Sequence, residues 1–323
     1  MSASRIADHD ASHLRRLLTG TGLWLDIGAT QIHLLSDSRH LASQLQRVYG
    51  RFPLIDRADW ADLHLQIRRP KGLRRWMAPQ VGFQCDGQTP FEPFPADSPL
   101  PMMEWGSNWL IGNRLNHLLL FHSGVVERDG LALVMPAIPG SGKSTLTAAL
   151  SLSGWRLLSD EFGAFEPLQH RFQAMLKPIA LKNQSIEVIQ RFAPHAHLGP
   201  EFPKTRKGTV AHLAAELDSV DRRHEPARPG AVVLPHWQAG SATSLTPLTQ
   251  STLFSSLAFN AFNYQLLGEV GFRAVMHLTR RCLGWQLTYS DLDDAIGALN
   301  RLWPQVIEHH QALDRGRAEG APS

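Results

Sequence analysis

The sequence has only two cysteines and no long uninterrupted hydrophobic run. Cys85 and Cys282 are widely separated and have no metal-ligand spacing around them, which argues against both a disulfide framework and a zinc site. The most apolar region, residues 118–138, is interrupted by charged residues at 127–129 and is too short on either side to cross a bilayer. Residues 1–20 also lack the basic and apolar regions of a signal peptide. We therefore expect a cytoplasmic protein with reduced thiols that does not enter a membrane.

The charge balance and the histidine spacing exclude two further classes of site. The formal net charge of +3 is too small an excess for a nucleic-acid-binding surface, so we expect no nucleic acid as a partner. The 16 histidines include no His-Glu-x-x-His motif and no paired Cys/His spacing, which argues against a structural metal site. With 43% hydrophobic residues the chain can bury a core, and its 323 residues favour two domains.

A stretch rich in proline and turn-forming residues, 86–103, divides the chain into two parts. We expect residues 1–100 to form a small N-terminal α+β module and residues 104–312 to form the main domain. Residues 313–323 are predicted to be a frayed tail. Periodicity predicts strands at 23–35, 62–69, 118–126, 131–138, 208–213, 231–237 and 285–290, and helices at 40–50, 183–192, 250–266, 269–282 and from 292 onward. The Asp129-Gly130 pair predicts that the strands at 118–126 and 131–138 form a hairpin.

The segment AIPGSGKST at residues 137–145 matches the phosphate-binding pattern G-x-x-x-x-G-K-[ST] except at its first position, which is Ala137. An apolar strand precedes the segment and a run of helix-forming residues follows it, which is the context that such a loop requires. Gly140 and Gly142 let the backbone approach phosphate oxygens, and the N-terminus of the following helix favours negative charge. Pro139 stiffens the turn, so we expect the loop to tolerate Ala137. The expected nucleotide contacts are Pro139, Gly140, Ser141, Gly142, Lys143, Ser144 and Thr145.

Two adjacent acids, Asp160 and Glu161, follow the next predicted strand. Lys143 would place a positive charge at the β and γ phosphates, and Ser144 and Asp160 would bind Mg²⁺. The other carboxylate could accept a proton from an attacking hydroxyl, and the sequence leaves open which of the two acids is this base. Because the chain has no N-K-x-D element for guanine and no L-S-G-G-Q segment, ATP is the expected nucleotide.

The segment GSGKSTLTAALSLSGWRLLSDEF at residues 140–162 resembles the HPr kinase/phosphorylase family. In that family the loop is followed by a helix, a Gly-x-Arg-Leu turn and two adjacent acids at the same distance from the lysine. Upstream, residues 118–137 are similar to the family's strand pair and place His122 at its active-site histidine. Much of the region 23–305 is similar to the subgroup called HprK-related kinase A, in the stretches 104–109, 177–186, 207–213, 260–272 and 289–296.

This resemblance implies a fold, site residues and partners. The implied fold is α/β with a P-loop, like phosphoenolpyruvate carboxykinase and the C-terminal domain of HPr kinase: a mixed sheet flanked by helices, beside the small N-terminal module. Lys143, Asp160, Glu161 and His122 would be catalytic, with the second acid, Glu161 here and aspartate in the family, as the proton acceptor. Members of the subgroup are associated with a small PqqD-like peptide chaperone, which implies a modified peptide as the acceptor.

Together these patterns lead to one main functional hypothesis and two alternatives. We expect an ATP- and Mg²⁺-dependent kinase that transfers the γ-phosphoryl group to a hydroxyl, preferably serine, of a peptide or small protein. The alternatives are a non-catalytic module in which ATP operates a peptide-binding surface, and a kinase that acts on a small molecule. The sequence leaves open the reverse phosphorylase reaction and the oligomeric state, a homo-oligomer included.

Overall fold

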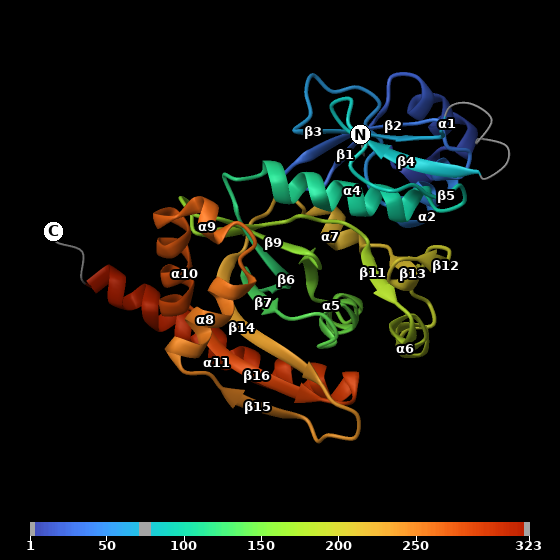
Figure 1. The fold of residues 1–323 in the computed structure, drawn as a ribbon. Coiled ribbons are helices and arrows are strands. Elements are labelled where there is room, and N and C mark those ends of the chain that lie inside the picture. The colour runs from blue at the N-terminus through green and yellow to red at the C-terminus, as the bar shows by residue number, and fades with distance from the viewer. Residues whose placement is uncertain (1–3, 71–78, 320–323) are drawn as a thin grey trace. The chain divides into compact units, whose positions relative to one another are not determined.

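The computed structural model describes residues 4–70 and 79–319, which belong to two compact units (Figure 1). As far as its residues are described, the first unit consists of Met1–Leu115 and Met175–His224. The second unit consists of Asn116–Ala174 and Glu225–Ser323, within the same limits. Each unit therefore combines two separate segments of the chain.

This division differs from the single boundary expected in the proline-rich stretch, because residues 175–224 fold with the N-terminal part of the chain. Two ion pairs inside the first unit, one buried and one partly buried, connect these segments. Lys177 Nζ lies 3.0 Å from Glu104 Oε2, and the partly buried Arg223 has its Nη2 2.8 Å from Oδ2 of the buried Asp26. Buried charges need partners, so each pair holds residues 175–224 against N-terminal residues.

Among the described residues, a five-stranded sheet and four helical segments belong to the N-terminal part of the first unit. In sheet order the strands are β1 (Leu23–Asp26), β2 (Gln31–Ser36), β3 (Leu63–Arg68), β4 (Gln80–Gln84) and β5 (Phe94–Pro95), and the helices are η1 (Ile6–Asp8), α1 (Ala11–Thr19), α2 (Leu41–Val48) and α4 (Pro99–Arg114). Strands β2 and β3 alternate in burial, as their hydrophobic periodicity predicted. The stretch 23–35, expected as one strand, is instead a hairpin of β1 and β2, because Gly28 makes a turn with a φ of 101°.

A small antiparallel sheet with two helices completes the first unit. In sheet order its strands are β11 (Ile179–Lys182), β13 (Gly208–Leu213) and β12 (Phe202–Thr205), and the helices are α6 (Gln184–Phe192) and α7 (Leu217–Asp221). The strand predicted at 208–213 and the helix predicted at 183–192 are confirmed.

A mixed sheet flanked by helices forms the second unit, and the chain is therefore an α/β protein. In sheet order the strands are β10 (Arg171–Gln173), β9 (Phe162–Glu166), β6 (Leu119–Arg128), β7 (Leu131–Pro136), β14 (Arg228–Trp237), β16 (Leu283–Tyr289) and β15 (Ser244–Pro247), and β8 (Arg156–Ser159) also pairs with β6. Strands β7, β14 and β16 are parallel to one another, and the other pairs are antiparallel. The predicted hairpin of β6 and β7 is confirmed, with Asp129 and Gly130 at positive φ in its turn.

The helices of the second unit are α5 (Lys143–Leu152), α8 (Gln250–Asn260), α9 (Tyr264–Leu267), α10 (Glu269–Arg281) and α11 (Leu292–Glu319). Helix α11 continues to Glu319, so the expectation of a frayed tail from residue 313 is wrong as far as that residue, and residues 320–323 lie outside the described part. Within this stretch the Asp314 carboxylate lies 2.7 Å from Arg228 Nη1 and 3.2 Å from Arg281 Nη2, so two ion pairs connect this part of α11 to β14 and α10.

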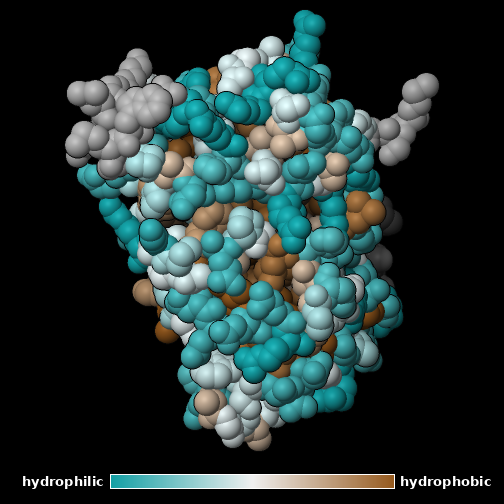
Figure 2. All heavy atoms as spheres, turned by 90° about the vertical axis from the view of Figure 1, so that its right-hand side faces the viewer, coloured by the Kyte–Doolittle hydropathy of each residue, from teal (hydrophilic) through white to brown (hydrophobic). Residues whose placement is uncertain are grey.

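The surface is largely polar on the side that Figure 2 draws, where hydrophilic residues cover most of the face. Among the helices that the structure describes, none is long and apolar enough to cross a membrane.

Candidate functional site

The glycine-containing loop lies between β7 and α5, as the sequence predicted. All six residues of β7 are buried, so the strand delivers the chain from the centre of the sheet to the loop. Gly140 and Gly142 both have a φ of 89°, a backbone conformation that residues with a Cβ rarely adopt. A Cβ on Gly142 would also lie 2.5 Å from the Tyr289 hydroxyl oxygen and 2.9 Å from Trp237 Cβ, whereas a Cβ on Gly140 would meet nothing within 4 Å.

The carbonyl groups of the loop are held by neighbouring strands. The main-chain N–H of Trp237 donates to the Ser141 carbonyl at 3.0 Å, and the Tyr289 hydroxyl donates to the Gly142 carbonyl at 3.2 Å. At the start of α5 the first N–H groups have no acceptor within the helix, because their partners would precede it. A helix N-terminus of this kind favours anions, and here it directly follows two glycines.

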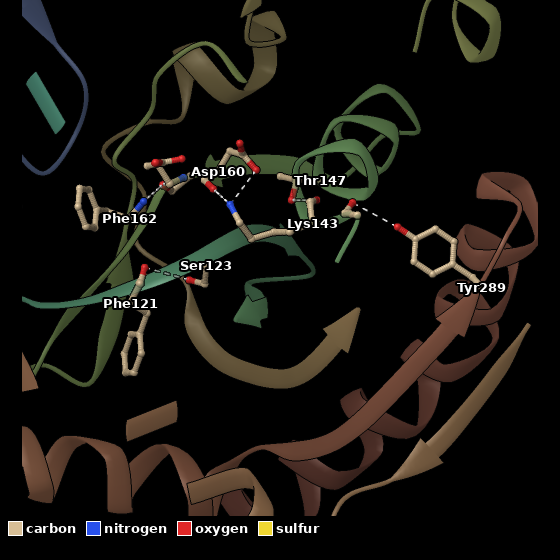
Figure 3. Close-up of polar contacts among 10 residues, drawn as sticks. Phe121, Ser123, Lys143, Thr147, Asp160, Phe162 and Tyr289 are labelled. Atoms are coloured by element: carbon tan, nitrogen blue, oxygen red, sulfur yellow. Dashed lines mark hydrogen bonds and ion pairs between the residues drawn. The ribbon is translucent and has the colours of Figure 1, made fainter. Parts of the chain in front are cut away.

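Lys143 turns its ammonium group toward the acid that follows β8 (Figure 3). Its Nζ donates to the main-chain oxygen of Asp160 and lies 3.4 Å from the Asp160 carboxylate. Both side chains are buried, with 7% of Lys143 and 6% of Asp160 exposed. The Thr147 hydroxyl donates to the Lys143 carbonyl at 2.9 Å and so fixes the first turn of α5. The lysine and the acid therefore form one internal ion pair at the end of the loop.

Asp160 is also in contact with the loop's serine. Burial raises the pKa of Asp160, and the negative charge of Glu161 raises it further. The positive charge of Lys143 and a hydrogen bond with the Ser144 side chain act in the opposite direction and lower this pKa. The fold thus brings together Lys143, Ser144 and Asp160, three of the residues that the sequence singled out.

Glu161 lies at the corner between β8 and β9, and both strands pair with β6. Val125 on β6 is paired with Ser159, and His122 is paired with Phe162, so the two acids lie opposite residues 123–124 of β6. The Ser159 hydroxyl accepts the main-chain N–H groups of Glu161 at 3.3 Å and of Phe162 at 3.1 Å, which shapes the corner. Asp160 is buried, whereas Glu161 is partly exposed.

His122 is on β6, directly across from the residue that follows the acid pair. Its side chain is partly exposed, while its neighbours along the strand, Phe121 and Ser123, are fully buried. The strand register therefore brings His122 to the corner that carries the two acids.

Three positions near the loop were not singled out by the sequence analysis. Gly124 on β6 faces α5, and a Cβ there would overlap the Thr147 hydroxyl, so a glycine is needed for the helix to pack this closely. Its signal was a glycine within a strand pattern, which often marks close backbone approach. Trp237 and Tyr289 fix the loop from the next two strands, and no local sequence pattern indicates this role.

The possible metal ligands are few. Among the residues that the structure describes, no three His, Cys, Asp or Glu side chains are placed to hold a metal ion. The Ser144 hydroxyl and the Asp160 carboxylate are hard oxygen donors, and Mg²⁺ commonly takes one or two such ligands and completes its octahedron with phosphate and water oxygens. These two side chains therefore fit Mg²⁺ that arrives with a nucleotide.

Neither the protein-family models nor the curated proteins that were compared with the chain match it.

Proposed function

We propose that this chain is an ATP- and Mg²⁺-dependent kinase of the HPr-kinase-related type, which transfers the γ-phosphoryl group to a hydroxyl. The observation that carries the proposal is the convergence of Lys143, Ser144 and Asp160 beside two glycines at the N-terminus of α5. A lysine that neutralises phosphate and a serine and a carboxylate that hold Mg²⁺ are the recurring parts of phosphoryl transfer. A merely structural loop has no need for a buried charge pair, which is costly to desolvate.

In this proposal the loop and α5 bind the phosphates through main-chain N–H groups. Lys143 exchanges its bond to the Asp160 main-chain oxygen for a phosphate oxygen, a short movement for a long and flexible side chain. Ser144 and Asp160 hold Mg²⁺, which when bound neutralises the charge on the β and γ phosphates. Catalysis then depends on positioning and charge stabilisation by groups that are already in place.

Glu161 is the base that we assign to the acceptor hydroxyl. Asp160 is buried and engaged by Lys143 and Ser144, so its oxygens serve the loop side of the site. Glu161 is the more exposed of the two acids and follows directly, so an incoming hydroxyl reaches its carboxylate more easily. His122, across the strand pair at the same corner, is the second polar side chain that an acceptor would meet.

The acceptor class rests on the resemblance to the HprK-related kinase A subgroup. It favours a serine of a peptide or small protein, presented with the help of a small PqqD-like chaperone. The test is incubation with Mg²⁺ and γ-labelled ATP together with small proteins encoded beside this chain, with intact mass spectrometry to locate the added phosphate. Transfer to such a protein is the expected result.

Two variants and one control make this test specific. Lys143→Ala should abolish transfer, and Glu161→Gln, a change at a partly exposed position that leaves the ion pair intact, should reduce transfer more than ATP binding. Lys204→Ala removes a lysine on the exposed surface of the first unit and should have no effect. Transfer that survives Lys143→Ala would refute the proposal. ATP binding with no transfer to any acceptor would favour the non-catalytic module, and label on a small molecule would change the acceptor class.

A further inference from the structure

Trp237 is the last residue of β14 and lies beside the glycine loop. Its N–H donates to the Ser141 carbonyl at 3.0 Å, and a Cβ on Gly142 would lie 2.9 Å from the Trp237 Cβ. The tryptophan backbone therefore contacts the centre of the loop. Even so, 48% of the residue is exposed, so much of the side chain is in contact with solvent.

The indole is not exposed because its polar N–H needs water. The indole Nε1–H donates to the Ser290 carbonyl at 3.2 Å, so the ring is anchored at its polar edge. What remains open to solvent is therefore aromatic surface in a fixed orientation. Such a rigid and amphipathic ring is well suited to stacking against another planar group.

The strand order shows which part of a nucleotide would reach this ring. Strands β7, β14 and β16 are parallel, so the loop, Trp237 and Tyr289 all lie at the carboxyl ends of neighbouring strands. This edge is where open α/β sheets bind their ligands. The acid pair lies on the other flank of β7, because β8 and β9 pair with β6. Figure 3 shows the same order, with Lys143 between Asp160 and Tyr289.

This order fixes the direction of a bound nucleoside triphosphate. If the terminal phosphate lies at Lys143 and Asp160, the rest of the polyphosphate follows the loop away from the acids. The nucleoside then emerges toward the ends of β14 and β16. Of the residues on that flank, Trp237 is the large aromatic side chain with substantial exposed surface, since Tyr289 is only 1% exposed.

We propose that Trp237 is the stacking surface for the base of the bound nucleotide, in a subsite at the carboxyl ends of β14 and β16. The turn after Trp237 forms the outer wall of this subsite. It is held in place because the Gln238 N–H donates to the Tyr289 carbonyl at 2.9 Å and the Ser290 hydroxyl donates to the Ser241 carbonyl at 2.8 Å. The inference rests on the proposed nucleotide-binding function and adds to it the residue that binds the base.

The experiment compares ATP with inorganic tripolyphosphate, which has the phosphates and lacks the base. Binding of each to the full chain is measured by calorimetry with Mg²⁺ present. Base stacking on an aromatic side chain gives roughly 5- to 150-fold in affinity, so Trp237→Ala should weaken ATP binding by about that factor. Tripolyphosphate binding should be unchanged, and Trp237→Phe should retain most of the affinity for ATP. Trp60→Ala, at a tryptophan of the first unit that is 62% exposed, is the matched control and should change neither.

The outcomes separate this inference from the function on which it rests. If Lys143→Ala weakens the binding of both ligands and Trp237→Ala weakens neither, the stacking role is wrong and the nucleotide site stands. If Trp237→Ala weakens both ligands equally, the ring supports the loop and not the base, which also overturns the inference. If Trp237→Ala binds both ligands normally but loses transfer to the protein acceptor, Trp237 contacts the acceptor and not the base, and the inference is also wrong. If the unmodified chain binds neither ligand, both proposals fail.

Discussion

Alanine substitutions at Gly140 and Gly142 form a matched pair that separates the loop's role in stability from its role in binding. Both glycines have the same φ of 89°, so each substitution places an L-residue in the left-handed region at a cost of about 1–2 kcal/mol. At Gly142 the new Cβ would also meet the Tyr289 hydroxyl at 2.5 Å and Trp237 Cβ at 2.9 Å. Overpacking of this kind costs about 1–3 kcal/mol more. At Gly140 the new Cβ would meet no protein atom within 4 Å.

The two variants should therefore differ in opposite directions in two assays. Gly142→Ala should lower the free energy of unfolding by about 2–5 kcal/mol in urea titrations followed by circular dichroism, and Gly140→Ala by only about 1–2 kcal/mol. In the ATP calorimetry we expect the larger effect, relative to the loss of stability, in Gly140→Ala. Its methyl group projects from the loop into open space, where the proposed function places phosphate oxygens, so the loss of ATP affinity should exceed what the loss of stability explains.

A second substitution checks that the clash is the cause. Tyr289→Phe removes the hydroxyl that Gly142→Ala would meet, and on its own it loses one hydrogen bond to the Gly142 carbonyl, a cost of about 0.5–1.5 kcal/mol. In combination with Gly142→Ala it should recover part of the lost stability, so the double variant should be more stable than the sum of the single changes predicts. Two results would contradict these roles of the glycines: a Gly140→Ala variant less stable than Gly142→Ala, or a Gly140→Ala variant that binds ATP like the unmodified chain.

Three further predictions follow from buried charges. Burial raises the pKa of Asp160, so its carboxyl group favours folding below the ordinary carboxyl pKa and loses this contribution as the pH rises through the raised pKa. Asp160→Asn leaves the buried Lys143 ammonium without its counterion, so it should unfold at a lower temperature than the unmodified chain at pH 7 and lose phosphoryl transfer, and an equal or higher unfolding temperature would contradict this. Glu127 and Arg156 form an ion pair 2.5 Å apart with 3% of each side chain exposed. Glu127→Ala leaves Arg156 without this partner and should lower the free energy of unfolding by about 3–5 kcal/mol in urea titrations. A loss below about 1 kcal/mol would show that the pair does not stabilise the fold. Burial lowers the pKa of His212 from 6.5 to about 4, so the neutral imidazole favours folding above pH 6.5. As the pH falls from 6.5 to about 4, the first unit should lose about 3 kcal/mol of stability, and this pH dependence should be weaker in His212→Leu.

Local patterns in the sequence were enough to predict the elements that carry the loop. The hairpin of β6 and β7 followed from the Asp129-Gly130 pair, because both residues accept the positive φ that a two-residue turn needs. The run of helix-forming residues after the loop predicted a helix there, and α5 begins at Lys143. These features depend on a few neighbouring residues, so a single sequence contains the information that determines them.

The division into two units could not be predicted in the same way. Glu104 and Lys177 lie far apart in the sequence, and nothing near either residue shows that they form a buried pair. The Tyr49 hydroxyl donates to the same Glu104 carboxylate at 2.6 Å, and the Ser107 hydroxyl accepts from Lys177 at 2.7 Å. Such a network depends on where the sheets place their ends, which is a property of the whole chain. For the same reason the role of Trp237 beside the loop had no local signal.

The ion pair of Lys143 and Asp160 has a consequence for nucleotide binding that the motif alone does not contain. A buried ammonium group without a partner would be costly, so Asp160 acts as an internal counterion that keeps the lysine, and with it the first turn of α5, in a single conformation. Phosphate must then compete with a carboxylate already 3.4 Å from the Nζ. If the Asp160 carboxylate held Mg²⁺, its charge would be neutralised and it would no longer compete with phosphate for Lys143. Withdrawal of Mg²⁺ should therefore lower the affinity of the unmodified chain for ATP much more than it lowers the affinity of Asp160→Ala, in which the competing carboxylate is missing. Calorimetry of both proteins with and without Mg²⁺ measures this difference. Equal Mg²⁺ dependence in the two proteins would show that Asp160 neither competes for Lys143 nor holds the metal.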